Sequence, residues 1–269
     1  MYIYNTGWVI GEEVTKKEPK STTTTKEIDL QDILDFYIDS YMDKLNNVLN
    51  KFGITLTKDK NSLSNGKGYY LVIKSEKELE IGRGLNSLGI GFKNDNKVIL
   101  ITFEPIKLIY NSYVKELNQV LIKAIPTEYT YLFITMVNKL NPITDSDLIN
   151  DLEKTSILTR NTDRLKDTRV AIETLIKLIN TDKEIRNKKI ITRALEKASL
   201  VYTKMNRDYK SIRDTILTLD IHSGNWKISI TDKGEELILI DPFVVYYGDI
   251  VKDADFINKV SREFIKRNN

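Results

Sequence analysis

The sequence predicts an α+β fold in two lobes: a small β-rich N-terminal lobe and a mostly helical, shortened C-terminal lobe, with a helical extension in front. Two patterns support this prediction. Short apolar runs alternate with glycine-containing turns from Tyr69 to Met136, as in an antiparallel sheet. From Thr144 to Ile216 the apolar residues instead recur at helical spacing. The expected parts are the extension (1–60), the β-rich lobe (61–137) and the helical lobe (138–269).

The extension divides into a polar beginning and a helical end. Residues 1–26 contain one candidate strand, TGWVIGEEV, and then a KKEPKSTTTTK run that is typical of a flexible linker. Apolar residues from Leu30 to Leu49 follow a 3.6-residue period, and Gly53 suits the C-terminal stop, so one amphipathic helix is expected over about 28–52. Its apolar stripe either packs on the rest of the chain or binds a partner, including a second copy of the chain.

The β-rich lobe is expected to hold three strands, YYLVIK, ELEIGRGLNSLGIGF and KVILITF. Gly82, Gly84 and Gly89 lie in the second of these runs, and such glycines let a backbone approach phosphate oxygens closely. Residues 105–126 are typical of a helix closed by Pro126, and residues 128–143 of a strand that leads into a polar connector. After the helical lobe, a last helix is expected from about Asp253 to Arg267.

The stretch from Thr218 to Phe243 carries the chemistry. It is patterned as strand, polar loop, strand, tight turn and strand, with Asp220, Asn225 and Asp241 at its corners. The hairpin brings Asp241 back beside the other two. One carboxylate can then accept a proton from a hydroxyl, while the amide oxygen and the other carboxylate suit Mg²⁺. This division of roles is that of kinase-type phosphoryl transfer.

These residues also carry a family resemblance. LDIHSGNW followed by LILIDPF resembles the catalytic loop and metal-binding segment of the protein-kinase-like superfamily, above all its aminoglycoside- and choline-kinase branch, and is similar to small kinase-like proteins of tailed phages. The resemblance implies ATP and Mg²⁺ as cofactors, with Asp220 as catalytic base and Asn225 and Asp241 as metal ligands. Thr218 departs from the pattern, which has histidine there, and so does Pro242 after Asp241. His222 takes the place of a second histidine of that branch.

The same resemblance implies roles upstream. It places a glycine-rich lid over the ATP phosphates at Gly82, Arg83 and Gly84, and the helix glutamate at Glu116. Adenine would be bound by the main chain from Val137 to Lys139, with Met136 guarding the inner pocket.

The lysine that a kinase carries on its third strand is missing here, since Leu100 stands at that position in KVILITF. A leucine offers no charge to the phosphates. Lys93, at the end of the neighbouring strand, is the expected substitute, and Arg83 is the second candidate.

The amino-acid composition argues against several other kinds of site and partner. With no cysteine and one histidine, disulfides, thiol catalysis and a zinc site are not expected. A net charge of +3 from 41 basic and 38 acidic residues disfavours nucleic acid as the partner. No apolar run approaches the roughly 20 residues of a membrane span, and the N-terminus lacks a signal-like core. A cytoplasmic protein is expected, in the host cytoplasm if a phage encodes it, with a protein as substrate or partner.

Three functions remain open at this point. The first is an ATP-dependent phosphotransferase, of the phage type of serine/threonine protein kinase. The second is a kinase-fold pseudoenzyme that binds a protein partner, which Leu100 and the short region after Asp241 favour. The third is nucleotidyl transfer from ATP bound in the reversed orientation. That short region leaves no room for an activation segment of the eukaryotic kind.

Overall fold

The structure is a computed structural model that describes residues 24–29, 33–59, 70–84, 86–162, 165, 167–213, 215, 217–232, 234–244 and 250–269. The candidate strand TGWVIGEEV and the linker run before Thr24 lie outside these residues. The fold is α+β and divides into two compact units. The helical unit contains Pro105–Gln119 and Leu140–Asn269, and the sheet unit contains Thr6–Glu104 and Val120–Lys139. Only the described residues of each unit are discussed.

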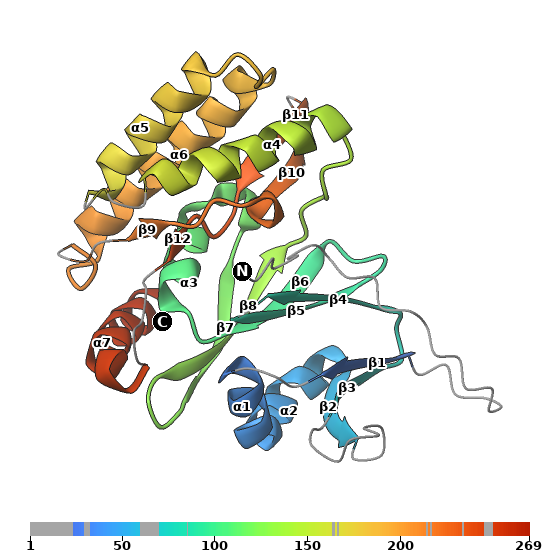
Figure 1. The fold of residues 1–269 in the computed structure, drawn as a ribbon. Helices are drawn as coiled ribbons and strands as arrows, with labels where there is room; N and C mark the ends of the chain where they lie inside the picture. The colour runs from blue at the N-terminus through green and yellow to red at the C-terminus, as the bar shows by residue number, and fades with distance from the viewer. Residues whose placement is uncertain are drawn as a thin grey trace, which may run out of the picture. The chain divides into compact units, whose positions relative to one another are not determined.

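The helical unit contains most of the expected C-terminal helices. Helices α4 (Ser146–Thr159), α5 (Thr168–Thr181) and α6 (Lys188–Asp208) pack side by side (Figure 1). Helix α3 (Pro105–Tyr113) packs against α6 and against α7 (Ile250–Asn268). The prediction of helices after Thr144 and of one at the C-terminus is confirmed. Asp145 caps α4, because its carboxylate accepts hydrogen bonds from the main-chain N–H groups of the first turn.

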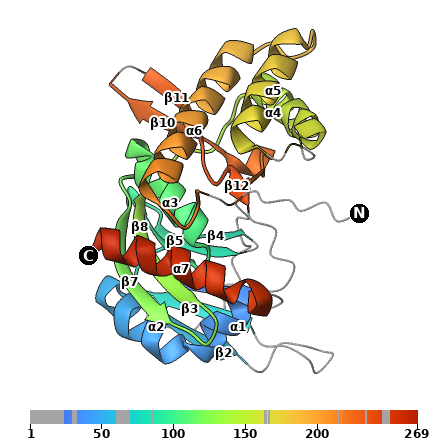
Figure 2. The same ribbon diagram turned by 90° about the vertical axis from the view of Figure 1, so that its left-hand side faces the viewer.

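Short strands connect the helices of this unit. Strand β9 (Thr218–Leu219) pairs with β12 (Phe243–Val244), and between them β10 (Trp226–Thr231) and β11 (Gly234–Leu239) form an antiparallel hairpin (Figure 2). A 3₁₀ turn, η4 (Ser223–Asn225), precedes β10. The predicted order of strand, polar loop, strand, turn and strand is therefore confirmed.

The sheet unit is built on a five-stranded antiparallel sheet in the order β4-β5-β6-β8-β7. The strands are β4 (Leu79–Gly84), β5 (Ser87–Phe92), β6 (Lys97–Thr102), β7 (Val120–Pro126) and β8 (Tyr131–Asn138). A second, three-stranded sheet has the order β1-β3-β2, with β1 (Thr24–Asp29), β2 (Ile54–Asp59) and β3 (Tyr70–Ser75). The YYLVIK run therefore belongs to a different sheet from the glycine-bearing strands, instead of forming one layer with them.

The register of the large sheet assigns side chains to its two faces. Ile81, Ile90, Ile99 and Met136 form one cross-strand row, and Gly82, Gly89, Leu100 and Thr135 form the next. Because neighbouring residues of a strand point to opposite faces, these two rows lie on opposite faces. The first face is the one on which α1 (Ile33–Ser40) packs, since the Tyr37 ring lies 5.6 Å from that of Phe103.

The predicted helix over 28–52 is only partly correct. Residues Thr24–Asp29 form strand β1, and the helical residues divide into α1, α2 (Met42–Leu49) and the 3₁₀ turn η1 (Asn50–Phe52). Threonines favour a strand at the start of this region, where the apolar period is not yet established. The helices bury their apolar stripe inside the sheet unit, at Leu34, Tyr37, Ile38, Leu45 and Leu49. A role of this region in binding a partner or a second copy stays a prediction.

The predicted single helix over 105–126 is wrong. Helix α3 ends at Tyr113, a 3₁₀ turn η2 (Lys115–Leu117) follows, and the remaining residues form strand β7. Two residues interrupt the helix: Val114 is extended, and Asn118 has a positive φ of 41°. The β-branched and apolar residues after Asn118 then gain more from pairing with β8 than from a further helical turn.

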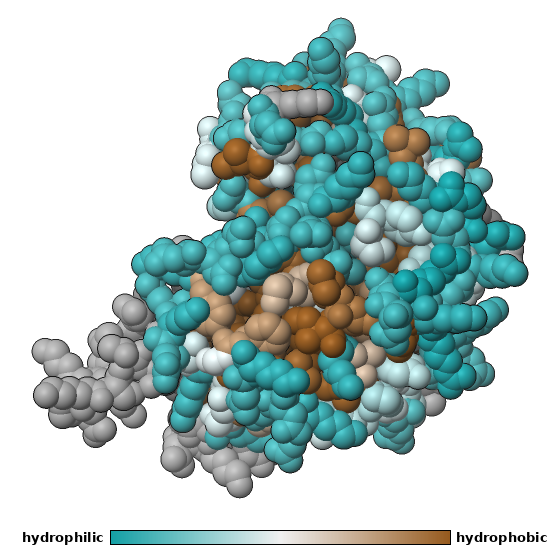
Figure 3. Space-filling model, turned by 180° about the vertical axis from the view of Figure 1, so that it is seen from behind, coloured by the Kyte–Doolittle hydropathy of each residue, from teal (hydrophilic) through white to brown (hydrophobic). Residues whose placement is uncertain are grey.

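Polar side chains cover most of the face drawn in Figure 3, and apolar ones are gathered in a patch near its middle. The large apolar side chains that the described residues expose are Phe36, Val120, Ile157, Val170, Ile190, Leu200 and Ile230. None of the described helices is both long and apolar enough to cross a membrane.

Candidate functional site

Asn225 joins the two ends of the Thr218–Phe243 stretch. Its Nδ2 atom donates one hydrogen bond to the main-chain carbonyl of Asp220 (2.8 Å) and another to that of Asp241 (2.9 Å). The side chain is buried, so its two amide protons need acceptors within the protein, and these two carbonyls provide them. Three residues that are up to 21 positions apart are thereby fixed to one another.

Main-chain hydrogen bonds reinforce this arrangement. The N–H of Asp220 donates to the carbonyl of Pro242 (2.9 Å), and the N–H of Ile240 donates to the carbonyl of Asn225 (2.7 Å). On the other side, the hydroxyl of Thr168 at the start of α5 donates to the carbonyl of Leu217, just before β9. The loop that carries Asp220 is therefore bound both to the Asp241 turn and to the helices.

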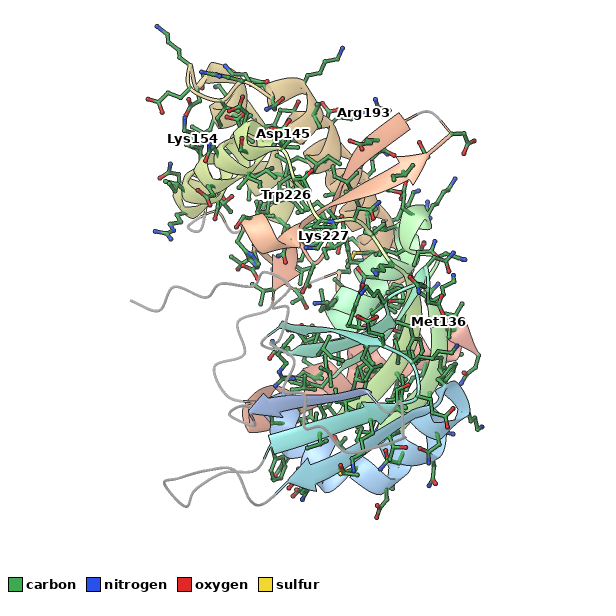
Figure 4. All side chains as sticks on the ribbon, turned by 90° about the vertical axis from the view of Figure 1, so that its right-hand side faces the viewer. Met136, Asp145, Lys154, Arg193, Trp226 and Lys227 are labelled. Carbon is green, nitrogen blue, oxygen red and sulfur yellow. The ribbon has the colours of Figure 1, made fainter. Side chains whose placement is uncertain are left out.

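Strand β10 anchors the loop in the core. It begins with Trp226 and Lys227, both buried and labelled in Figure 4. Burial lowers the pKa of Lys227. Further along β10, Ile228 exchanges two main-chain hydrogen bonds with Asn141, in the connector that precedes α4. The buried start of β10 and its paired centre leave little freedom to Asn225, which lies directly before Trp226.

Asp241 has a constrained backbone conformation. Its φ is +52°, a left-handed conformation that a non-glycine residue adopts at a cost and that is common at active sites. Its carboxylate pairs with a residue that the sequence did not single out: Lys107 Nζ, from the first turns of α3, lies 2.5 Å from Asp241 Oδ2. Both side chains are mostly buried, with exposed fractions of 16% for Lys107 and 19% for Asp241.

A tyrosine holds α3 against the Asp241 turn. Tyr110 is buried, and its hydroxyl donates to the carbonyl of Leu239 (3.0 Å). Its ring meets that of Phe243 edge-on, with 5.5 Å between the ring centroids. Burial, with Asp241 and Glu116 adding to it, raises the pKa of Tyr110 far above its ordinary value, so the hydroxyl stays protonated and remains a donor. Lys107 stands one helical turn before Tyr110 and therefore on the same side of α3.

The environment of Asp220 suits a proton acceptor. Although its side chain reaches solvent, the protein surrounds it closely, and this desolvation is the main cause that raises its pKa. His222 lowers the pKa of this carboxyl, Asp241 raises it and Lys107 lowers it. His222 is itself held by a hydrogen bond, in which its Nδ1 atom accepts from the N–H of Gly224 (3.2 Å).

The oxygen ligands expected for Mg²⁺ are present. Because both amide protons of Asn225 are used, its Oδ1 atom is the side-chain group that remains to contact a cation. The Asp241 carboxylate offers a second hard oxygen, and amide and carboxylate oxygens are donor types that suit Mg²⁺. Within the described ranges, no group of three or more histidine, aspartate, glutamate or cysteine side chains is placed to hold a metal ion.

The two cationic side chains proposed from the sequence form ion pairs within the sheet unit. Lys93 is 58% exposed, and its ammonium pairs with Glu78 at 2.8 Å. Arg83 pairs with Asp35 of α1. Arg83 stands in a cross-strand row with Leu88 and Ile101, on the face opposite to Leu100. Arg83 therefore points away from the face that carries Leu100, and the Lys93 ammonium is paired with Glu78.

The other upstream candidates are also placed by the sheet register. Gly82 and Gly84 are paired residues of β4, opposite Gly89 and Ser87. Met136 lies in β8 on the α1 side of the sheet (Figure 4), whereas the residue directly opposite Leu100 is Thr135.

At the end of β8, the predicted adenine-binding main chain is partly engaged. Val137 pairs with Val98 of β6, and the N–H of Lys139 already donates to the carbonyl of Asn96 (2.7 Å). The Lys139 side chain pairs with Glu80. Glu116 lies in η2, beyond the end of α3, with Lys197 Nζ of α6 4.0 Å from its carboxylate.

Two residues of interest were missed by the sequence reasoning. Lys107 stands in IKLIY, where apolar residues at helical spacing surround one lysine, and this is the signal that was available. Thr135 is fully buried, and its hydroxyl has no hydrogen-bond partner among the described residues. Nothing in the run YLFITMV distinguishes that threonine from an ordinary strand residue.

Comparison with known proteins adds no family. The chain matches no model of a known protein family, no curated protein and no solved structure.

Proposed function

We propose that the chain is an ATP-dependent phosphotransferase of protein-kinase-like fold, with Asp220 as the base and with Asp241 and Asn225 as the residues that hold Mg²⁺. The observation that carries the proposal is the double hydrogen bond of Asn225, which fixes the Asp220 and Asp241 segments side by side. That arrangement supports the roles that the motif implies. When bound, Mg²⁺ would supply charge neutralisation to the transferred phosphoryl group.

The residues of the chain divide the remaining work. Asp220 would receive the proton of the acceptor hydroxyl, and a pKa raised by desolvation makes it a better acceptor than an ordinary aspartate. The left-handed backbone of Asp241 and its contact with Lys107 hold its carboxylate in one orientation. The substrate class favoured by the resemblance is a serine or threonine hydroxyl of a protein.

The order of elements in the sheet unit and in α3 also supports this proposal. A hairpin with Gly82, Gly84 and Gly89 comes first, then a third strand, then a helix, then two strands and the connector. This is the sequence of parts that the resemblance requires, with Leu100 in the middle of the third strand. Since the third strand of a kinase carries the phosphate-binding lysine, the proposal needs a cation from another element.

A second candidate function is a kinase-fold module that binds a protein partner and has lost its chemistry. Leu100 favours it, and so does the ion pair of Lys107 with Asp241, since a carboxylate that is paired with a lysine is less available to bind a metal ion.

Labelled nucleotides distinguish these functions. The protein is incubated with Mg²⁺ and with ATP labelled at either the α- or the γ-phosphate, and protein-bound label is measured beside an Asp220→Asn variant. Transfer of γ-label that depends on Asp220 supports the phosphotransferase. Transfer of α-label would instead identify nucleotidyl transfer. No transfer together with no heat of Mg-ATP binding in calorimetry would leave the binding module.

A further inference from the structure

The phosphates of a bound nucleotide need an opposing positive charge from the protein, because they carry several negative charges into a partly dry site. Leu100 cannot supply it. Its cross-strand neighbours on the same face, Gly89 and Thr135, are uncharged as well. A cation that serves the nucleotide must therefore come from outside this row of the sheet.

Lys107 is the cation that the structure places beside the candidate metal ligand. Its Nζ atom lies 2.5 Å from Asp241 Oδ2, and its side chain is 84% covered by protein, since 16% of it is exposed. Lysine is rarely buried to this degree unless its charge is used, because removal of the ammonium from water is costly. The expected substitutes differ: Lys93 is largely exposed and pairs with a glutamate, and Arg83 pairs with Asp35.

Lys107 is also held in position. Tyr110, one turn further along α3, is bound on both sides of Asp241: to the Leu239 carbonyl two residues before it and to the Phe243 ring two residues after it. A helix fixed in this way cannot rotate away without breaking a buried hydrogen bond and an aromatic contact. The ammonium is thus directed at Asp241 by the fold.

We infer that Lys107 of α3 supplies the phosphate-binding charge that Leu100 cannot, with its ammonium shared between Asp241 and the phosphate chain of the nucleotide. The inference rests on the proposed function and adds a residue to it. An ammonium has three N–H donors, so it can contact a carboxylate and a phosphate oxygen at the same time. The chain would then carry its phosphate-binding lysine on the helix after the third strand and not on the strand itself.

Calorimetry can test this with two ligands, Mg-ATP and adenosine. Lys107→Met should weaken Mg-ATP binding on the order of 10- to 100-fold, the effect of one lost charge-assisted contact, and leave adenosine binding within about twofold. Adenosine lacks phosphates, so its affinity reports whether the variant is still folded. Lys115→Met is the matched control, because Lys115 is an exposed lysine just beyond α3 and its loss changes the net charge equally. It should bind both ligands as the wild type does.

A second measurement uses the wild-type protein and so does not depend on how a variant folds. An acyl phosphate of ATP transfers its acyl group to a lysine near the phosphates: the amine forms an amide, the bond from the acyl carbon to the phosphate oxygen breaks, ATP leaves and the amine proton passes to water. Mass spectrometry should find the label on Lys107, and excess Mg-ATP should prevent it. Protected label on Lys93, or on another lysine in place of Lys107, would overturn the inference.

The outcomes separate the two proposals. If the wild type binds no Mg-ATP, both fail. If it binds Mg-ATP and Lys107→Met binds equally tightly, the assignment of Lys107 alone fails. If Lys107→Met binds more tightly, the assignment fails as well, and Lys107 instead competes with the metal ion for Asp241.

Discussion

The loop region around Asp220 and Asp241 and the five-stranded sheet both carry charged side chains, but they arrange them differently. In the loop region, Lys107 and Asp241 form a mostly buried pair, and both influence the charge of Asp220. In the sheet unit, the charged groups form separate pairs: Lys93 with Glu78, Lys139 with Glu80 and Arg83 with Asp35. The first arrangement gathers charge at one place, and the second distributes it.

The two arrangements of charged residues call for different explanations. An exposed pair such as Lys93 with Glu78 contributes about 0–1 kcal/mol and needs no function to explain it. The pair of Arg83 with Asp35 is mostly buried, and it joins α1 to the sheet. Two carboxylates and a lysine that share a site, with one carboxylate of raised pKa, are instead typical of functional sites. Substitutions in the two regions can test whether that distinction is real.

The largest effect is expected from Asp241→Asn. The change removes the charge that would hold Mg²⁺, so Mg-ATP affinity should fall at least about 10²-fold in calorimetry. Asp220→Asn is the control, because a base acts on the hydroxyl and leaves nucleotide binding within about threefold. Equal Mg-ATP binding by Asp241→Asn and the wild type would mean that Asp241 has only a structural role in the loop region.

The next effect concerns stability. Asn225→Ala removes two hydrogen bonds made by a buried side chain, so the free energy of unfolding should fall by about 1–3 kcal/mol. Urea denaturation measures it. Asn138→Ala is the control in the sheet unit, where a half-buried asparagine accepts a hydrogen bond from Lys97, and it should cost less than about 1 kcal/mol. Similar losses in the free energy of unfolding at the two positions would mean that the hydrogen bonds of Asn225 stabilise the protein no more than those of an ordinary half-buried asparagine.

The loop region could be predicted from the sequence because its contacts are short in range. Asp220, Asn225 and Asp241 lie within one strand-turn-strand pattern, and the alternation of apolar residues with a tight turn determines which corners meet. Lys107 could not be found in this way. It is 134 residues from Asp241, and only the packing of α3 on β12 and the last helices brings them together.

Strand β7 was mistaken for helix for a related reason. The run VLIKAIP is compatible with either structure, and pairing with β8 decides between them. The face of the sheet on which each side chain lies could not be predicted from the sequence either, because a register shift of one residue moves every side chain to the opposite face. Met136 and Thr135 are neighbours in the sequence, yet Thr135 is the one opposite Leu100.

A smaller effect is expected from Tyr110→Phe. The variant keeps the ring against Phe243 and loses the hydrogen bond to the Leu239 carbonyl, so the free energy of unfolding should fall by about 1–2 kcal/mol. Tyr202→Phe is the matched control, since the Tyr202 ring also packs on Phe243, 5.4 Å between centroids, and no hydrogen bond of its hydroxyl is seen within the described residues. Denaturation that finds equal losses would show that Tyr110 does not fix α3 through its hydroxyl.

The smallest effect separates a carboxylate placed for chemistry from one placed for structure. The pKa of Asp220 is raised above its ordinary value of 3.8, mainly by desolvation, so the folded state binds its proton more tightly than the unfolded state does. Its contribution to stability is therefore fully present below pH 3.8 and is lost as the pH rises through the higher folded pKa. Asp220→Asn should be more stable than the wild type at pH 7, by less than about 1 kcal/mol because the side chain reaches solvent, and this advantage should shrink in acid.

Glu263 should behave in the opposite way. Burial alone would raise its pKa, but hydrogen bonds from Ser211 and Lys210 outweigh that and lower it. Its contribution is then present above its ordinary pKa of 4.5 and is lost as the pH falls, so Glu263→Gln should be less stable than the wild type at pH 7, with a difference that narrows in acid. Urea denaturation at pH 7 and at about pH 4 measures both variants. If Asp220→Asn destabilised the protein as Glu263→Gln is expected to do, Asp220 would be a structural carboxylate, and the gathered charges of the loop region would need no chemistry to explain them.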